Sequence, residues 1–166
     1  MMKYLQKLGK AIMLPVAVLP VAAIMMGIGY AMCPATMQGG DVTGIIQIIG
    51  FALVKIGSAV IDKLPMLFAV GVAIGLSKDQ HGAAGLAGLV AFLTVTTVLN
   101  SGVVATMMGA EEAPLAFSKI DNAFIGIISG ITASVCYNKF SSAQLPTALA
   151  FFSGKRCVPI VTSFVM

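Results

Sequence analysis

The sequence predicts an all-α membrane protein with about five transmembrane helices and one amphipathic helix at the membrane interface. Hydrophobic residues make up 58% of the 166 residues and charged residues only 10%, whereas soluble domains carry about 25% charged residues. No charged residue occurs between Lys10 and Asp41, and about 20 consecutive apolar residues in a helix match the hydrocarbon core of a bilayer. Because so few charges cannot coat a surface that faces water, we expect a lipid bilayer around this chain.

The first expected span covers residues 11–32. Pro15 and Pro20 each remove a backbone donor, so we expect this helix to be kinked or irregular near its start. The three lysines in the first ten residues also resemble the basic region of a signal peptide. A membrane span is favoured over a cleaved leader, because the apolar stretch is longer than a typical signal core and more apolar stretches follow it.

The second span is expected at 43–61, where Lys55 can extend its ammonium group toward the lipid headgroups. The third segment, 64–77, has only fourteen residues between Lys63 and Lys78. That length is short for a crossing and favours a re-entrant helix. The two flanking lysines leave a short full span as the alternative, if both extend to the headgroups.

The fourth and fifth spans are expected at 82–99 and 122–138, with an acidic loop at 100–121 between them. The N-terminal tail has three lysines and no acid, which predicts a cytoplasmic N-terminus. Residues 139–156 carry three bases and no acid. Basic stretches tend to face the cytoplasm. Counting crossings from a cytoplasmic N-terminus, 139–156 faces the cytoplasm and the acidic loop faces the outside only if 64–77 does not cross the membrane. The charge pattern therefore favours a re-entrant helix at 64–77.

An amphipathic helix is predicted in the connector 141–156, because four apolar residues there repeat with helical spacing. These are Leu145, Ala148, Leu149 and Phe152. Such a helix is expected to lie in the plane of the interface. Residues 157–166 begin another apolar element that is too short to span. We therefore divide the chain into a transmembrane region at 1–140, the connector, and the start of a truncated element, and expect it to be a fragment.

Two pairs of glycines with GxxxG spacing allow helix backbones to approach each other closely in lipid. They are Gly71 with Gly75, and Gly126 with Gly130. The spacing leaves ordinary helix packing and a specific dimer contact equally open.

Three residues are candidates for contact with substrate: His81, Lys155 and Arg156. The two cations can meet a phosphate or a sugar hydroxyl, and their alternative role is to anchor a helix end. They do not form a phosphate-binding loop, because Leu149 replaces the first glycine and Arg156 replaces the Ser or Thr. His81 lies at a segment boundary, where a polar interfacial role is the more usual one.

The composition does not indicate catalysis, metal or cofactor binding, or nucleic-acid binding. With one histidine, three cysteines without CxxC spacing and acids confined to segment ends or loops, the sequence predicts no catalytic triad, no metal site and no cofactor. The net charge of +4 is scattered over segment ends, so no nucleic-acid partner is expected.

Four stretches carry a resemblance to a known family. They are LQKLGKAIMLPVAVLPVAAI at 5–24, LPMLFAVGVAIGLSKDQHGAAGLAGLVAFL at 64–93, GIISGITASVCYNKF at 126–140 and LPTALAFFSGKRCVPIVT at 145–162. Together they resemble EIIC, the membrane subunit of the bacterial sugar phosphotransferase system, in its glucose and N-acetylglucosamine branch. Residues 33–50 and 100–121 are the least similar regions.

The resemblance implies a multi-pass permease of the bacterial cell membrane that moves a hexose inward while an EIIB domain phosphorylates it. The phosphate is then supplied by soluble phosphocarrier proteins. It further implies five full crossings, a homodimer formed through the N-terminal helices, and a scaffold role for 1–140. Lys155 and Arg156 match the GKRCVPI segment near the junction of the two halves of such proteins.

Most of the sugar pocket in these proteins lies in a C-terminal half with a GITE-like glutamate and a histidine, which this sequence does not contain. The chain is therefore expected to be a phosphotransferase component that is inactive alone, and glucose and N-acetylglucosamine stay open. The alternative function is a non-catalytic membrane protein that only dimerises with, or regulates, a complete permease. A small pore-forming protein is disfavoured because no polar helix face is evident.

Overall fold

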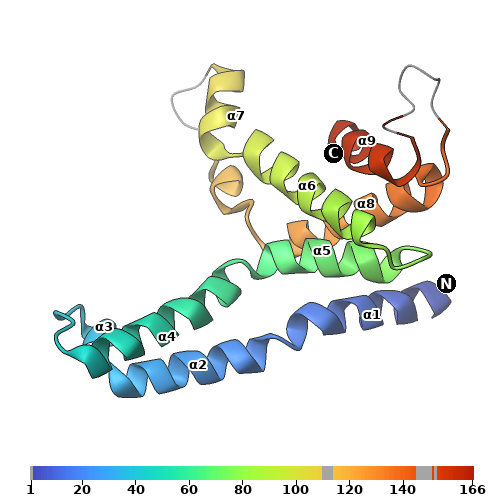
Figure 1. Ribbon diagram of the computed structural model, residues 1–166. Helices are drawn as coiled ribbons and strands as arrows, with labels where there is room; N and C mark the ends of the chain where they lie inside the picture. The colour runs from blue at the N-terminus through green and yellow to red at the C-terminus, as the bar shows by residue number, and fades with distance from the viewer. Residues whose placement is uncertain (1, 110–113, 145–150, 152) are drawn as a thin grey trace. The chain divides into compact units, whose positions relative to one another are not determined.

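A computed structural model of the chain describes residues 2–109, 114–144, 151 and 153–166, and these contain helices and turns but no strand (Figure 1). The chain divides into two compact units. One comprises residues up to Met13 together with Pro65–Met166, and the other comprises Leu14–Leu64.

The chain starts as helix α1, Met2–Val16, which breaks at Ala17 and Val18 before α2 begins at Leu19. Pro15 lies in the last turn of α1, and Pro20 lies in the first turn of α2. Proline is tolerated in a first turn but removes a hydrogen bond inside a helix. The expected irregularity near these prolines is thus confirmed, although the helix starts at Met2 rather than at residue 11.

The unit Leu14–Leu64 is built on a helix pair. It contains α2 (Leu19–Met32), the short α3 (Ala35–Gln38) and α4 (Ile45–Asp62), and α2 packs along α4. At the contact, a Cβ atom added to Gly29 would lie 2.6 Å from the Gly50 carbonyl oxygen. The absence of side chains at both positions therefore lets the two backbones meet.

The other unit follows α1 with α5, α6, α8 and α9, joined by shorter helical segments. Their bounds are α5 Leu64–Leu76, α6 Gly82–Val98, α7 Ser101–Met108, η1 Leu115–Lys119, α8 Ala123–Phe140, η3 Gly154–Arg156 and α9 Cys157–Val165. Helix α6 packs against both α8 and α9, and α8 also contacts α9.

The core of this unit consists mainly of small side chains, which bring the helices close together. It comprises Ala73, Ala84, Ala87, Ala91, Ala133, Cys136, Tyr137 and Val158. Tyr137 is the largest fully buried side chain among the described residues. A buried tyrosine usually directs its hydroxyl to a polar partner, and this partner is found at the end of α5.

The expected all-α membrane class is confirmed among the described residues. Among the described residues, Met2–Met32, Ile45–Asp62 and Ala123–Phe140 are each long and apolar enough to cross a membrane. A fourth span results only if α6 and α7, which meet at a bend of 53°, are counted together. Helix α5 has 13 residues. Helix α5, the third expected segment, is shorter than a full crossing, and α6 with 17 residues lies at the lower end of the spanning range of about 17–25 residues.

The segment 100–121 was expected to be a loop, but it contains α7 and η1, and the side chain of Asn100 caps α7 by accepting a hydrogen bond from the Gly102 N–H. The expected amphipathic helix over Leu145–Phe152 falls largely on residues 145–150 and 152, which lie outside the described residues.

Candidate functional site

A cluster of polar side chains lies where α5 ends, where α8 ends and where η3 begins. Its members, which we call the polar junction, are Lys78, Asp79, Tyr137, Asn138 and Lys155. The Asp79 carboxylate accepts a hydrogen bond from Lys155 Nζ at 2.6 Å and another from the Tyr137 hydroxyl at 3.0 Å. Three segments distant in sequence therefore meet at one carboxylate oxygen.

Asn138 holds the same loop through its side-chain amide. Its Oδ1 accepts from the Lys78 backbone N–H at 2.8 Å, and its Nδ2 donates to the Leu76 carbonyl at 3.1 Å. The last four carbonyls of a helix have no partner within it. The last turn of α8 thus satisfies one of these carbonyls at the end of α5 and fixes the loop that follows.

Local backbone geometry brings the charged residues of the junction together. In the loop after α5, Gln80 adopts a positive φ of 49°, which is uncommon outside glycine and turns the chain toward α6. On the other side, Gly154 has a φ of 69°, and its N–H donates to the Ala143 carbonyl at 2.9 Å. A residue with a Cβ is strained in this conformation, so Gly154 suits the turn that leads to Lys155.

Electrostatics favours the charged forms of Asp79 and Lys155. The hydrogen bond from Lys155, more than any other cause, lowers the pKa of Asp79 below its usual value, against an opposing effect of desolvation. The same hydrogen bond raises the pKa of Lys155. A general acid or base works best with a pKa near the operating pH. The pKa of Asp79 falls and that of Lys155 rises, so both move further from neutral pH. The pair is therefore suited to keeping its charges and hydrogen bonds rather than to transferring protons.

The structure places the three candidate substrate residues in different surroundings. Lys155 is in the polar junction. His81 caps α6, its Nδ1 accepting from the Ala83 N–H at 3.1 Å. The Arg156 guanidinium lies 5.1 Å from the centre of the Phe151 ring and donates to the Phe151 carbonyl at 3.4 Å. Lys155 and Arg156 are adjacent in sequence but are held by separate groups.

Three of the four candidate packing glycines contact helices of the same chain. A Cβ on Gly126 would collide with the Pro65 carbonyl of α5, and one on Gly130 would lie 2.8 Å from the Ala69 carbonyl oxygen. Gly75 lies against Ala11 of α1. Gly71 is half-buried on α5.

Sequence reasoning did not single out Asp79, Tyr137 or Asn138 as functional. One signal was present, because Asp79 lies between Lys78 and His81 in a short loop. Its partners follow it by more than 50 residues, and only the packing of α8 and η3 brings them to it. Within the described regions of the chain, no group of three or more His, Cys, Asp or Glu side chains could hold a metal ion.

Comparison with known proteins gives a family match over residues 9–166, to the family described as phosphotransferase system, EIIC. The chain is 39% identical over 167 residues to the N-acetylglucosamine-specific EIICB component of the phosphotransferase system of Bacillus subtilis (strain 168), covering 99% of this chain and 30% of that protein. It is 37% identical over 180 residues to the glucose-specific EIICBA component of Staphylococcus saprophyticus subsp. saprophyticus, covering 98% of this chain and 26% of that protein. The chain therefore spans less than a third of the length of these relatives.

Proposed function

Because the chain belongs to the EIIC family of the phosphotransferase system, we propose that it is a portion of a permease that imports a hexose with coupled phosphorylation. The observation that carries this proposal is the family match, which runs from residue 9 to residue 166 and so includes both compact units. The two relatives are named for N-acetylglucosamine and for glucose. These sugars are therefore the two candidate substrates.

The proposed partners follow from the same relatives, whose names include an EIIB component. An EIIB domain would phosphorylate the sugar after receiving phosphate from soluble phosphocarriers, and two copies of the chain would form a homodimer. The proposed location is the bacterial cell membrane with a cytoplasmic N-terminus. The lysines of the first ten residues, with no acid before Asp41, support this orientation. Protease digestion of an N-terminal tag in inside-out but not right-side-out vesicles tests it.

Within this function, Lys155 is the best-supported of the three candidate sugar contacts. Its side chain is 42% exposed and that of Asp79 is 41% exposed, so the pair is accessible from outside the protein. An ammonium donor beside a carboxylate acceptor matches a sugar hydroxyl, which both donates and accepts. Arg156 and His81 already make local contacts, and we propose for them a supporting role beside Lys155.

The test is uptake by the complete permease in membrane vesicles supplied with phosphoenolpyruvate and the soluble carriers. Labelled glucose and N-acetylglucosamine are compared, and accumulation of the sugar phosphate is measured. We expect Lys155→Met to reduce uptake about tenfold or more, because hydrogen bonds from charged groups contribute about 1.5–3 kcal/mol. Lys119→Met removes the same charge from η1 and is the control.

The kinetic constants separate two roles for Lys155. A direct sugar contact predicts a rise in KM with Lys155→Met that exceeds the rise with Asp79→Asn. Equal effects of the two substitutions indicate that Lys155 is a positioning residue for the loop. Sugar accumulation without phosphorylation, or no uptake of either sugar by the unchanged permease, refutes the proposed function itself.

A further inference from the structure

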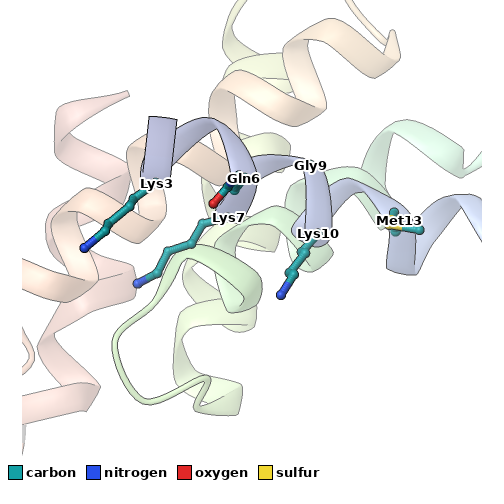
Figure 2. A pocket seen from close by; sticks show the side chains of 6 residues that line it. All are labelled: Lys3, Gln6, Lys7, Gly9, Lys10 and Met13. Carbon is teal, nitrogen blue, oxygen red and sulfur yellow. The ribbon is translucent and has the colours of Figure 1, made fainter. Parts of the chain in front are cut away.

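One side of α1 forms a continuous basic face. Lys3, Lys7 and Lys10 recur at i, i+4 and i+7, which places them on the same side of a helix. All three are exposed, and Figure 2 shows their ammonium groups extending to the same side of α1. A hollow of about 690 Å³ lies along this face, lined by Lys3, Gln6, Lys7, Gly9, Lys10 and Met13.

A second hollow extends from this basic face to the ends of α5 and α8. It has a volume of about 510 Å³ and is lined by Lys3, Tyr4, Lys7, Leu76, Lys78 and Asn138. All six residues belong to the same compact unit. Its volume lies within the range of about 300–1,000 Å³ found for small-molecule sites. Its lining contains three lysines and no acid, and we call it the lysine hollow.

The acid nearest to the lysine hollow in sequence does not neutralise it. Asp79 forms an ion pair with Lys155, and no other ion pair is found among the described residues. Asn138 meanwhile holds the backbone on both sides of Ser77 through its bonds to Leu76 and Lys78. The position of Lys78 is therefore fixed by hydrogen bonds of its backbone, while its ammonium group, like those of Lys3 and Lys7, has no acidic partner among the residues that the structure describes.

Helix α1, which lines the hollow, continues into a long apolar stretch. Residues Met2–Met32 form a candidate membrane span, and the hollow lies at its first turns. Tyr4, which lines the hollow, is 76% exposed, and Met13, which lines the adjoining basic face, is 69% exposed. Tyr4 adds an aromatic side chain of the kind enriched at membrane interfaces. A ligand here can thus place an anionic group among lysines and apolar chains along α1.

We propose that the lysine hollow binds the phosphate group of an anionic phospholipid. Basic pockets between membrane helices are suited to anionic headgroups, and lysine ammonium groups attract phosphate as point charges. The exposed side chains of Tyr4 and Met13 on α1 favour a lipid over free phosphate, because they offer contact to acyl chains that inorganic phosphate lacks. This site is separate from the proposed sugar contact at Lys155 and does not depend on it.

The test uses the purified protein in detergent, with phosphatidylglycerol as the probe and phosphatidylcholine as the neutral comparison. Native mass spectrometry over a range of lipid concentrations gives the affinity for each lipid. We expect phosphatidylglycerol to remain bound under conditions that remove phosphatidylcholine. Inorganic phosphate at the same concentration as the lipid should not displace it, and displacement would overturn the assignment to a phospholipid.

A matched pair of triple variants tests the location. Lys3→Gln, Lys7→Gln and Lys78→Gln together remove three charges from the hollow, and a lysine near an anionic surface strengthens binding about fivefold. We therefore expect about 100-fold weaker binding of phosphatidylglycerol. The control combines Lys55→Gln, Lys63→Gln and Lys119→Gln, which lie outside the hollow.

Two further outcomes overturn the proposal, and one supports its chemistry. Equal losses in the two triple variants indicate general surface charge, and equal affinities for the two lipids indicate purely apolar binding. The charge-retaining variant, with Lys3→Arg, Lys7→Arg and Lys78→Arg, should keep its preference for phosphatidylglycerol. Because the lysines of α1 are exposed, unchanged helical circular dichroism is expected for every variant, so a loss of binding reports on the site itself.

Discussion

Adding one methyl group at Gly126 should destabilise the protein, because the helix contact there has no room for it. A Cβ at this position would collide with the Pro65 carbonyl of α5 and would lie 2.9 Å from the carbonyl carbon. The opposing atoms are backbone, so they cannot rotate away. Overpacking of this kind costs about 1–3 kcal/mol, whereas replacing glycine by alanine in a helix gains about 0.8–1 kcal/mol. We expect Gly126→Ala to lower the free energy of unfolding by up to about 2 kcal/mol.

Gly27→Ala is the matched control, since it makes the same change inside α2 where nothing lies within 4 Å of the added Cβ. It should gain up to about 1 kcal/mol from helix propensity alone. Because both variants gain the same helix propensity, their free energies of unfolding should differ by the overpacking cost alone, about 1–3 kcal/mol. At about 2–4 °C per kcal/mol, that difference corresponds to about 2–12 °C between their melting temperatures.

The protein contains its own reporter for this measurement. Cys33, Cys136 and Cys157 are free and buried, so a fluorogenic thiol reagent reacts as the protein unfolds in detergent on heating. The order expected is Gly27→Ala highest, the unchanged protein next and Gly126→Ala lowest. If both variants melt at the temperature of the unchanged protein or above it, the close contact between α5 and α8 is refuted.

Three further predictions concern the polar junction and the cysteines. Asp79→Asn should lower the melting temperature at pH 7. Because the pKa of Asp79 is lowered in the folded state, its stabilising effect is present above its ordinary value of about 3.9 and is lost as the pH falls through the lower folded value. The difference from the unchanged protein should therefore vanish in acid, and a difference that persists there contradicts the ion pair. Asn138→Ala removes the acceptor of the Lys78 N–H, so hydrogen exchange at that amide should rise about fivefold, for a bond worth about 1 kcal/mol; unchanged exchange counts against the bond. The unheated protein should label slowly with a bulky maleimide, because its three thiols are buried, and fast labelling of any of them shows that the packing around it is wrong.

The apolar pattern was sufficient to locate the main helices. Apolar stretches with few or no charges predicted the spans that became α2, α4 and α8, since a helix buried in lipid needs length and apolar composition, both of which are local properties. Pro15 and Pro20 predicted an irregular helix, and the break at Ala17 and Val18 lies between them. This effect is also local, because a proline removes a backbone hydrogen-bond donor at its own position. The bend of 53° between α6 and α7 was not predicted, because the segment after Asn100 was judged by its charges rather than by its helical residues.

For the functional candidates, the sequence identified single residues but not the residues that contact them. Lys155 was recognised from its position next to Arg156 in a segment resembling the EIIC family, but the sequence could not show that Asp79 holds one cation and Phe151 the other. The GxxxG spacing predicted close helix contact at Gly126 and Gly130 without indicating that α5 of the same chain makes it. Spacing gives the face of a helix on which a residue lies, and it does not give the helix that packs there.

The sequence by itself determined that this protein belongs in a lipid bilayer and is helical, because hydrophobicity and helix length depend on residues near each other in the chain. It also carried the family resemblance. The tertiary structure alone decided which polar groups meet. Asp79 and Lys155 are 76 residues apart, and Lys3 and Lys78 line one hollow although several helices separate them in sequence. Such pairs form only when small side chains let α5, α6 and α8 pack closely, and that packing depends on the whole unit at once.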